Sequence, residues 1–280
     1  MRIDAHQHFW RYTPQEYGWI SEPLATLRRD FLPSDLRPLL TRHRIDACLA
    51  VQARQSLEET RWLLELAREH AWIAGVVGWI DLRAADAGDQ IARFTADPRL
   101  VGLRHIAQDE PDDGFLLRDD FCRGIAHLAR HDVAYDILVY ARQLPAAIGL
   151  ARRFPGQAFV LDHLGKPGVR RREREPWGAL MRELAELPNV ACKLSGLVTE
   201  ADWERWKPGD LAPYLNTALE AFGVERVMFG SDWPVCTLAA SYERWLAQLE
   251  GWSCMLTPAE RAALFGGTAA RIYALEDRRP

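Results

Sequence analysis

The chain has few lysines, no paired-cysteine motif and no long apolar run. Each of these shortages argues against a class of protein or a kind of site. Its 280 residues carry 35 basic and 39 acidic side chains, which leave a formal net charge of −4. That balance argues against a protein whose main task is to neutralise nucleic-acid phosphates. The longest uninterrupted apolar run, residues 71–80, has about half the length that a membrane-spanning helix needs. We therefore expect no nucleic-acid partner and no membrane partner.

The cysteines and the first residues bear on the compartment. The five cysteines are odd in number, widely scattered and without a Cys-x-x-Cys pair, so they indicate neither a disulfide framework nor a thiolate zinc site. The first ten residues place Asp4, His6 and His8 where a secretory signal would carry its apolar stretch. We expect a cytoplasmic protein.

The length and composition are those of a globular enzyme-sized domain. Hydrophobic residues make up 48% of the chain and charged residues 26%. A chain of this length buries enough surface for one large core without disulfides or a structural metal. No linker divides the sequence, so we expect residues 1–280 to form a single domain.

Eight short apolar runs recur along the chain, each followed by a longer segment with helical spacing. Most of the runs are continuous rather than alternating, which is typical of parallel strands covered on both faces. The predicted strands span residues 2–5, 45–52, 72–80, 100–104, 133–139, 157–162, 189–194 and 225–230. This alternation predicts an α/β fold, a (β/α)8 TIM barrel, with a doubly wound open sheet as the alternative. The glycine-rich loops of dinucleotide and phosphate binding are missing after the first strand.

An aromatic-rich segment, residues 9–33, follows the first strand. It is too long to be a bare connection in a compact domain. We interpret it as an insertion in the barrel with two possible roles. It either walls a substrate pocket, with Trp19 as a substrate contact, or forms a separate hydrophobic cluster over the barrel rim.

Half of the eight histidines follow predicted strands, and the others lie at or near the ends of predicted helices. The strand-end set is His6, His8, His105 and His163. Active-site residues of a TIM barrel lie where the strands end, so these four are the candidates for chemistry. The helix-end histidines are interpreted as structural, since a cation there complements the helix dipole.

His6, His8 and Asp232 are the strongest candidates. His6 and His8 are two residues apart, so on an extended backbone both imidazoles point to the same side and can converge on one ion or substrate oxygen. Asp232 follows a buried strand, where a carboxylate must be hydrogen-bonded, paired or metal-bound. Such surroundings tune a carboxylate for base chemistry, so we expect a functional role for Asp232. His163 either caps its strand or joins this group across the barrel mouth.

Three further basic residues end predicted strands. Arg104 and His105 are neighbours, so a regular strand turns one of them inward, and Arg104 is favoured as a group that stabilises a developing oxyanion. His105 reaches substrate if the strand is bulged. Lys193 either points into the mouth or reaches solvent past the rim. The basic residues 166–174, which alternate with acidic ones, are interpreted as a solvated loop.

Several of these segments together resemble a known family. The HQH of residues 6–8, the DH of 162–163, the KLSG of 193–196, the GSDWP of 230–234 and the GGTAARIY of 266–273 resemble the amidohydrolase superfamily, specifically its amidohydrolase-2 branch. Residues 30–33, 51–60 and 102–112 are similar to the sugar-lactone hydrolases of the L-fuconolactonase type. The similarity covers nearly the whole chain.

The resemblance implies a lactonase, a hydrolase that opens a sugar-derived lactone, an aldonolactone, to the sugar acid. By family motif, His6, His8 and His163 are metal ligands or groups that polarise the carbonyl, and Asp232 is the general base. Beside the resemblance, we expect a catalytic role for Arg104 and substrate contacts by His105, Lys193, Gln52 and Trp19. The metal ligands it implies are His6, His8, His163 and Asp232.

The resemblance leaves the metal requirement open, because members of this branch differ in it. The four ligands suit one divalent cation such as Zn²⁺, and a metal-independent reaction is the alternative. Two-metal members of the superfamily bridge their ions with a lysine, usually on strand 4. Here the chain has three lysines, Lys166, Lys193 and Lys207, none of them near strand 4. The sequence therefore argues against a lysine-bridged binuclear centre.

Two other functions share these residues. A metal-dependent nonoxidative decarboxylase of the same branch uses the same barrel, and a non-catalytic sugar-acid binder would retain the scaffold. The sequence leaves open the sugar configuration, the ring size and the oligomeric state.

Overall fold

The computed structural model describes residues 1–275 and contains eight parallel strands that pair in chain order, β1 to β8. The strands are β1 Ile3–Gln7, β2 Ala47–Val51, β3 Ile73–Gly78, β4 Leu100–His105, β5 Ala134–Ile137, β6 Phe159–Leu161, β7 Val190–Leu194 and β8 Val227–Phe229. A parallel bridge between Gln7 and Trp233 joins the end of β1 to the segment after β8. The sheet therefore closes into the predicted (β/α)8 barrel, and the open-sheet alternative is wrong.

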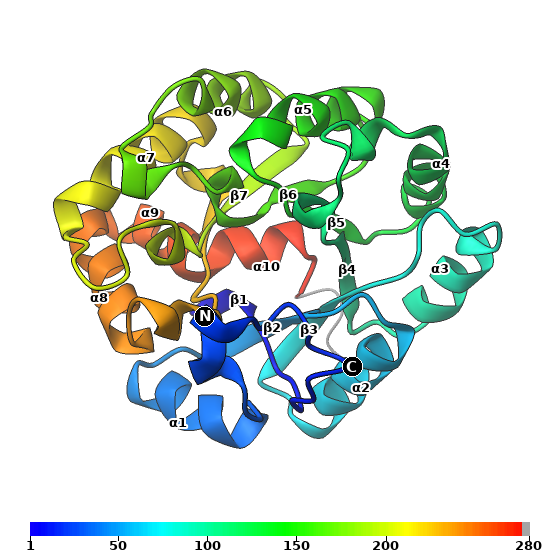
Figure 1. The fold of residues 1–280 in the computed structure, drawn as a ribbon, viewed down its shortest axis with the longest axis horizontal. Coiled ribbons are helices and arrows are strands. Elements are labelled where there is room, and N and C mark those ends of the chain that lie inside the picture. The colour runs from blue at the N-terminus through cyan, green and yellow to red at the C-terminus, as the bar shows by residue number, and fades with distance from the viewer. Residues whose placement is uncertain (276–280) are drawn as a thin grey trace.

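Helices surround this barrel, apart from the last one, α10, which lies across it in the view of Figure 1. They are α1 Pro33–Arg42, α2 Leu57–Glu69, α3 Ala87–Thr95, α4 Asp119–Leu128, α5 Leu144–Arg153, α6 Trp177–Ala185, α7 Pro208–Phe222, α8 Tyr242–Trp252, α9 Pro258–Ala262 and α10 Thr268–Ile272. Local chemistry fixes their starts, as at α9, where Thr257 and Glu260 form a reciprocal capping box before Pro258. Within residues 1–275, every helix is too short or too polar to cross a membrane.

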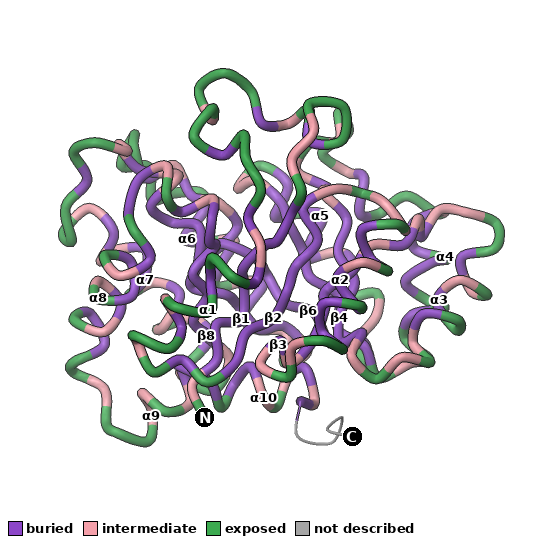
Figure 2. Tube along the Cα trace, turned by 90° about the horizontal axis from the view of Figure 1, so that it is seen from below, coloured by how far each residue is buried: buried purple, intermediate pink, exposed green. Residues whose placement is uncertain are grey.

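Apolar side chains fill two spaces. The larger cluster lies between the barrel and its helices, and a smaller one lies within the barrel, with members such as Ile3, Leu49, Val101 and Tyr273. Figure 2 shows the buried strands at the centre, with α10 and the N-terminus at the same end. Because this end of the barrel is plugged by apolar groups, the polar site residues gather toward the other end, where the strands terminate.

The insertion between β1 and α1 forms an aromatic cluster on the barrel rim. The ring of Trp10 contacts those of Tyr17, Trp19 and Phe31, and Phe31 in turn contacts Trp233 with centroids 5.3 Å apart. These residues are buried apart from Trp19, which is partly exposed. The cluster therefore packs on the segment after β8, which holds that segment against the barrel.

Candidate active site

A bulge in β1 brings two histidines into the barrel. The pairing of β1 with β2 changes register between Asp4 and Gln7, and such a bulge re-aims the side chains around it. The Nε2 atoms of His6 and His8 lie 3.2 Å apart, and both residues are buried. The structure therefore brings together the histidine pair that the spacing predicted.

His163 and Asp232 complete this group from strained backbone positions. His163 follows β6 with φ 54° and Asp232 follows β8 with φ 58°, a left-handed conformation that non-glycine residues adopt rarely and often at functional sites. The Oδ1 atom of Asp232 lies 3.4 Å from Nε2 of His8, 3.8 Å from Nε2 of His6 and 3.9 Å from Nε2 of His163. Residues from both ends of the chain thus meet around one carboxylate oxygen.

The donor atoms of His6, His8 and Asp232 fit a single divalent cation. Nδ1 of His8 lies 2.8 Å from the carbonyl oxygen of Val51, which can only accept, so the proton of His8 is on Nδ1 and its Nε2 lone pair faces the cluster. A tetrahedral zinc ion, with ligands about 2.0–2.1 Å away, separates its ligand atoms by about 3.4 Å. The distances among these three atoms, 3.2, 3.4 and 3.8 Å, match that spacing.

A buried charge network lies directly behind His6. The ammonium group of Lys193 contacts Asp136 and lies 3.1 Å from Asp162 Oδ1 and 3.2 Å from His6 Nδ1. The hydroxyl of Tyr273, which follows α10, donates to Asp136 at 2.8 Å. Lys193, Asp136 and Asp162 have no exposed side-chain surface. Of the two expected orientations, Lys193 therefore adopts the inward one. Its ammonium group is enclosed by carboxylates and is not open to a substrate.

Arg104 joins the network to the histidines. Its Nη1 atom donates to Asp162 at 2.9 Å and lies 3.3 Å from His6 Nε2. Its Nη2 donates to the carbonyl oxygen of Gln52, while the Gln52 side chain donates to the carbonyl oxygen of Arg104 at 3.2 Å. Arg104 and Gln52 thus bind each other, and Arg104 orients both His6 and Asp162.

Burial and neighbouring charges set the protonation of the site. Burial lowers the pKa of His163 to about 4, against the opposing influence of Asp232 and Asp162, and burial likewise lowers the pKa of His6 well below its usual value. Burial alone would raise the pKa of Asp232, but the imidazoles of His163, His6 and His8 outweigh it and hold that pKa below its usual range. At neutral pH the site therefore holds an ionised Asp232 beside neutral His6 and His163.

Two expected substrate contacts lie elsewhere. His105 turns to the opposite side of β4 from Arg104, as the alternation of a regular strand requires. Its Nε2 lies 2.7 Å from Glu110 and its ring stacks on Phe115 with centroids 4.7 Å apart, so it packs outside the barrel. Trp19 packs edge-on against Trp10 within the aromatic cluster. His105 therefore does not face the site as expected, and Trp19 belongs to the aromatic cluster on the rim.

Asp4 and Asp136 belong to the site region and were missed from the sequence. Oδ1 of Asp4 accepts hydrogen bonds from the backbone amides of His6 and Ser231, at 3.2 and 2.8 Å. Asp136 pairs with Lys193. Each is a lone carboxylate inside an apolar strand segment, RIDAH and AYDIL. That signal could have found them, because a buried carboxylate requires partners.

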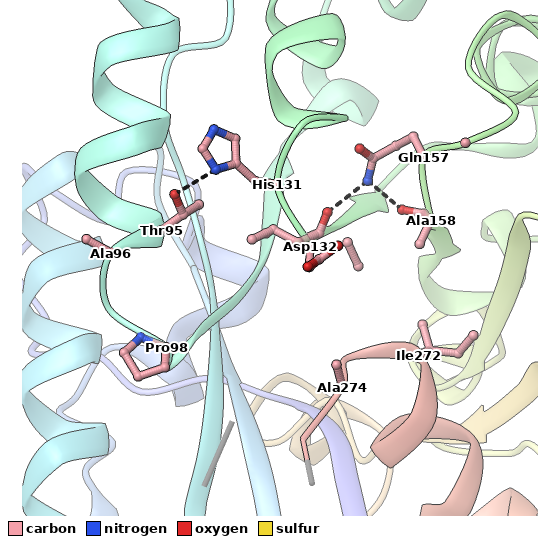
Figure 3. Close-up of a pocket in the computed structure, with 12 residues that line it drawn as sticks. Thr95, Ala96, Pro98, His131, Asp132, Gln157, Ala158, Ile272 and Ala274 are labelled. Atoms are coloured by element: carbon pink, nitrogen blue, oxygen red, sulfur yellow. Dashed lines mark hydrogen bonds between the residues drawn. The ribbon is translucent and has the colours of Figure 1, made fainter. Parts of the chain in front are cut away.

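A cavity of about 610 Å³ lies away from this site (Figure 3). Its walls include Thr95 and Pro98, which precede β4, and His131 and Gln157, which precede β5 and β6. Nδ1 of His131 hydrogen-bonds Thr95, and the Gln157 amide donates to the carbonyl oxygens of Val133 and Ala158. These residues mark the end of the barrel where the strands begin, which serves stability rather than chemistry.

Comparison with known proteins agrees with this geometry. The chain is 49% identical to an L-fucono-1,5-lactonase of Burkholderia multivorans, over 99% of this chain and 97% of that protein. It is 41% identical to an L-fucono-1,5-lactonase of Burkholderia ambifaria, over 98% of this chain and 96% of that one. A crystal structure of an amidohydrolase from Burkholderia multivorans with bound zinc superposes with a TM-score of 0.95 at 48% identity, covering 98% of this chain and 99% of that one.

The family assignment rests on nearly the whole chain. The family model described as "Amidohydrolase" matches residues 3–275, which include the HQH pair, Asp162, His163 and Asp232. The barrel, the imidazoles at its strand ends and the carboxylate after its last strand all lie within that match. The chain belongs to the amidohydrolase family.

Proposed function

We propose that this protein hydrolyses a sugar-derived lactone, of the L-fucono-1,5-lactone kind, to the open-chain sugar acid. The observation that carries the proposal is the ionised carboxylate of Asp232 within 3.9 Å of three imidazole nitrogens at the end of the barrel strands. The similarity to two L-fucono-1,5-lactonases over nearly their full lengths supports the substrate class.

In this proposal Asp232 transfers one proton twice. It accepts a proton from water as the water oxygen bonds to the lactone carbonyl carbon, which produces a tetrahedral intermediate. When the bond between that carbon and the ring oxygen breaks, Asp232 returns the proton to the departing oxygen. The products are one carboxyl group and one hydroxyl group on the same open chain, so the reaction consumes one water and no other reactant.

The neighbouring residues orient and polarise the substrate. His163 is neutral at pH 7 because burial lowers its pKa to about 4, so its ring can hydrogen-bond a substrate oxygen. Arg104 holds His6 and Asp162 in place and adds positive charge behind the site. Lys193 lies between Asp136 and Asp162 and partly neutralises their negative charges.

We also propose that His6, His8 and Asp232 hold one divalent cation, with His163 beside them. When bound there, such an ion polarises the carbonyl and lowers the pKa of water. The donor spacing and the histidine tautomer support this assignment. We further propose that the chain acts as one domain in the cytoplasm, supported by five free cysteines and the single barrel.

A panel of lactones tests the proposed function. Purified protein should release acid from six-carbon 1,5-lactones at neutral pH faster than from matched five-carbon 1,4-lactones, as followed by a pH indicator. The matched control is Asp232→Asn, prepared in parallel. Acid release equal to that control across the whole panel would rule the function out.

A further inference from the structure

Three side chains from consecutive loops gather beside the candidate active site without a role in the chemistry described above. Tyr140 follows β5, Lys166 follows β6, and Glu200 ends the short helix Leu197–Glu200 that follows β7. All three loops extend from the ends of strands, so they lie on the same side of the barrel as Asp232. They therefore flank the site on the side of the barrel where β5, β6 and β7 end.

Lys166 and Glu200 are held by their attachment to His163. The backbone amide of Lys166 donates to the carbonyl oxygen of His163 at 2.8 Å. On the other side, Gly196, which precedes the helix of Glu200, lies directly against the His163 ring. A Cβ atom at Gly196 would fall 2.4 Å from Nδ1 of His163, and its φ of 61° also favours glycine. The two loops are thus positioned by the same site residue.

The charged groups of the pair are close but not hydrogen-bonded to each other. Nζ of Lys166 lies 4.0 Å from Oε1 of Glu200, with side-chain exposures of 16% and 22%. The ammonium group also lies 5.3 Å from the centre of the Tyr140 ring. Within residues 1–275, neither charged group makes a side-chain hydrogen bond that would occupy it. The expectation of a solvated loop therefore holds for the exposed residues 170–174 but is wrong for Lys166.

We propose that Lys166 and Glu200 bind the ring hydroxyl groups of the substrate and thereby select a polyhydroxylated lactone. This inference rests on the proposed function and identifies two residues that would determine which lactone is bound. A half-buried ammonium can donate to a hydroxyl oxygen, and a half-buried carboxylate can accept the hydroxyl hydrogen. A pair 4.0 Å apart offers both groups to one hydroxyl or to two neighbouring ones.

The electrostatics agree with a position beside the reacting groups. Burial raises the pKa of Glu200, and the negative charge of Asp232 raises it further, against the opposing effect of Lys166. Lys166 in turn contributes to the lowering of the pKa of His163. Glu200 therefore interacts electrostatically with Asp232, and Lys166 with His163, the residues that perform the proposed chemistry.

The test compares variants on lactones that differ by one hydroxyl group. Glu200→Gln and Lys166→Met should each lower kcat/KM for a fully hydroxylated 1,5-lactone by about tenfold or more, mainly through KM, since a hydrogen bond to a charged group is lost. On a single-deoxy analogue that lacks the contacted hydroxyl, the same variant should lose less than about threefold. Glu204→Gln and Lys207→Met are the matched controls. Both residues are exposed, and Lys207 directly precedes α7, so neither substitution should change kcat/KM for either lactone.

The outcomes separate this inference from the proposed function. An equal loss on every analogue indicates a structural role and overturns the inference, as does no loss at all, while wild-type turnover leaves the function intact. If the wild type opens no lactone, the proposed function fails. Calorimetry with the open-chain sugar acid then decides the inference: tenfold weaker binding by both variants, but not by the controls, supports it, and unchanged or absent binding overturns it.

Discussion

The carboxylate of Asp4 accepts a hydrogen bond at 2.8 Å from the backbone amide of Ser231, the residue before Asp232. The same oxygen accepts the amide of His6 at 3.2 Å, and the other oxygen accepts the hydroxyl of Tyr242 at 3.2 Å. Asp4 thus ties a histidine of the first strand to the loop that carries the proposed base, although the two lie more than 220 residues apart in the chain.

Replacing Asp4 should therefore damage catalysis through geometry. Asp4→Ala leaves two buried amides without an acceptor, which should cost about 1–3 kcal/mol of unfolding free energy for each. It should also lower kcat by roughly 10- to 100-fold because Asp232 and His6 move. Asp4→Asn keeps an acceptor oxygen and should restore most of kcat. Equal kcat for the alanine variant and the wild type would contradict this positioning role.

Lys193 should be needed for stability because it lies between two buried carboxylates. Lys193→Met leaves Asp136 and Asp162 without their shared cation, and removing one partner of a buried ion pair typically costs about 3–5 kcal/mol. Chemical denaturation measures this loss. Adding Asp136→Asn to the variant should recover part of it, and the exposed Lys207→Met is the control. A Lys193→Met protein as stable as Lys207→Met would show that the network contributes nothing.

Much of the fold was predictable because continuous apolar runs mark strands that are buried on both faces. All eight strands lie at the predicted places, although β8, Val227–Phe229, is shorter than the predicted 225–230 because its flanking residues leave the sheet for the short helix before it and the loop of Asp232. The spacing of His6 and His8, together with their place after the first strand, also predicted that both rings lie on one side, and the bulge of β1 turns that side into the barrel. Local pattern was sufficient in these cases because each depends on residues close in the chain.

The remaining features depend on contacts between distant residues. The hydroxyl of Tyr273 donates to Asp136, 137 positions away in the chain, and no pattern in either segment indicates that the two residues are in contact. The direction of His105 depended on whether β4 was bulged near its end. β4 shifts its register against β3 between Leu100 and Gly102 but pairs regularly with β5 from Gly102 to His105. Lys166 stands in a basic run that resembles a solvated loop, yet its backbone bond to His163 keeps it at the site. Pair geometry of this kind is invisible in a single sequence.

The pH dependence of stability should carry a contribution from Glu59. Burial raises the pKa of Glu59 to about 7, against hydrogen bonds from the amides of Arg54 and Ala53. A carboxyl group whose pKa is higher in the folded state holds its proton there while the unfolded chain has lost it. Stability is therefore lost as pH rises from about 4.5 to about 7.

Glu59→Gln should remove that contribution. Between pH 4.5 and 7.5, the unfolding free energy of the wild type should fall by roughly 2–4 kcal/mol more than that of the variant, because each unit of pKa shift corresponds to about 1.4 kcal/mol. Urea denaturation at a series of pH values gives both curves. Parallel curves would mean that Glu59 titrates in the folded protein as it does in the unfolded chain.

The proposed cation site predicts a defined stoichiometry. Protein supplied with zinc and then dialysed should retain about one Zn²⁺ per chain by elemental analysis. His8→Ala removes a ligand whose tautomer is set by Val51 and should abolish this retention. His131→Ala, at the opposite end of the barrel beside Thr95, should retain zinc as the wild type does. Zinc retained equally by both variants would place the ion elsewhere.

Turnover by Asp232→Asn tests whether the carboxylate of Asp232 is the base. The asparagine keeps the shape of the side chain but cannot accept the proton of the attacking water. We predict that kcat for acid release from a six-carbon 1,5-lactone falls by about 100-fold to 10,000-fold, while the variant still binds the open-chain sugar acid by calorimetry. An Asp232→Asn protein that opens the lactone at the wild-type rate would show that the carboxylate at the centre of the three imidazoles is not the base.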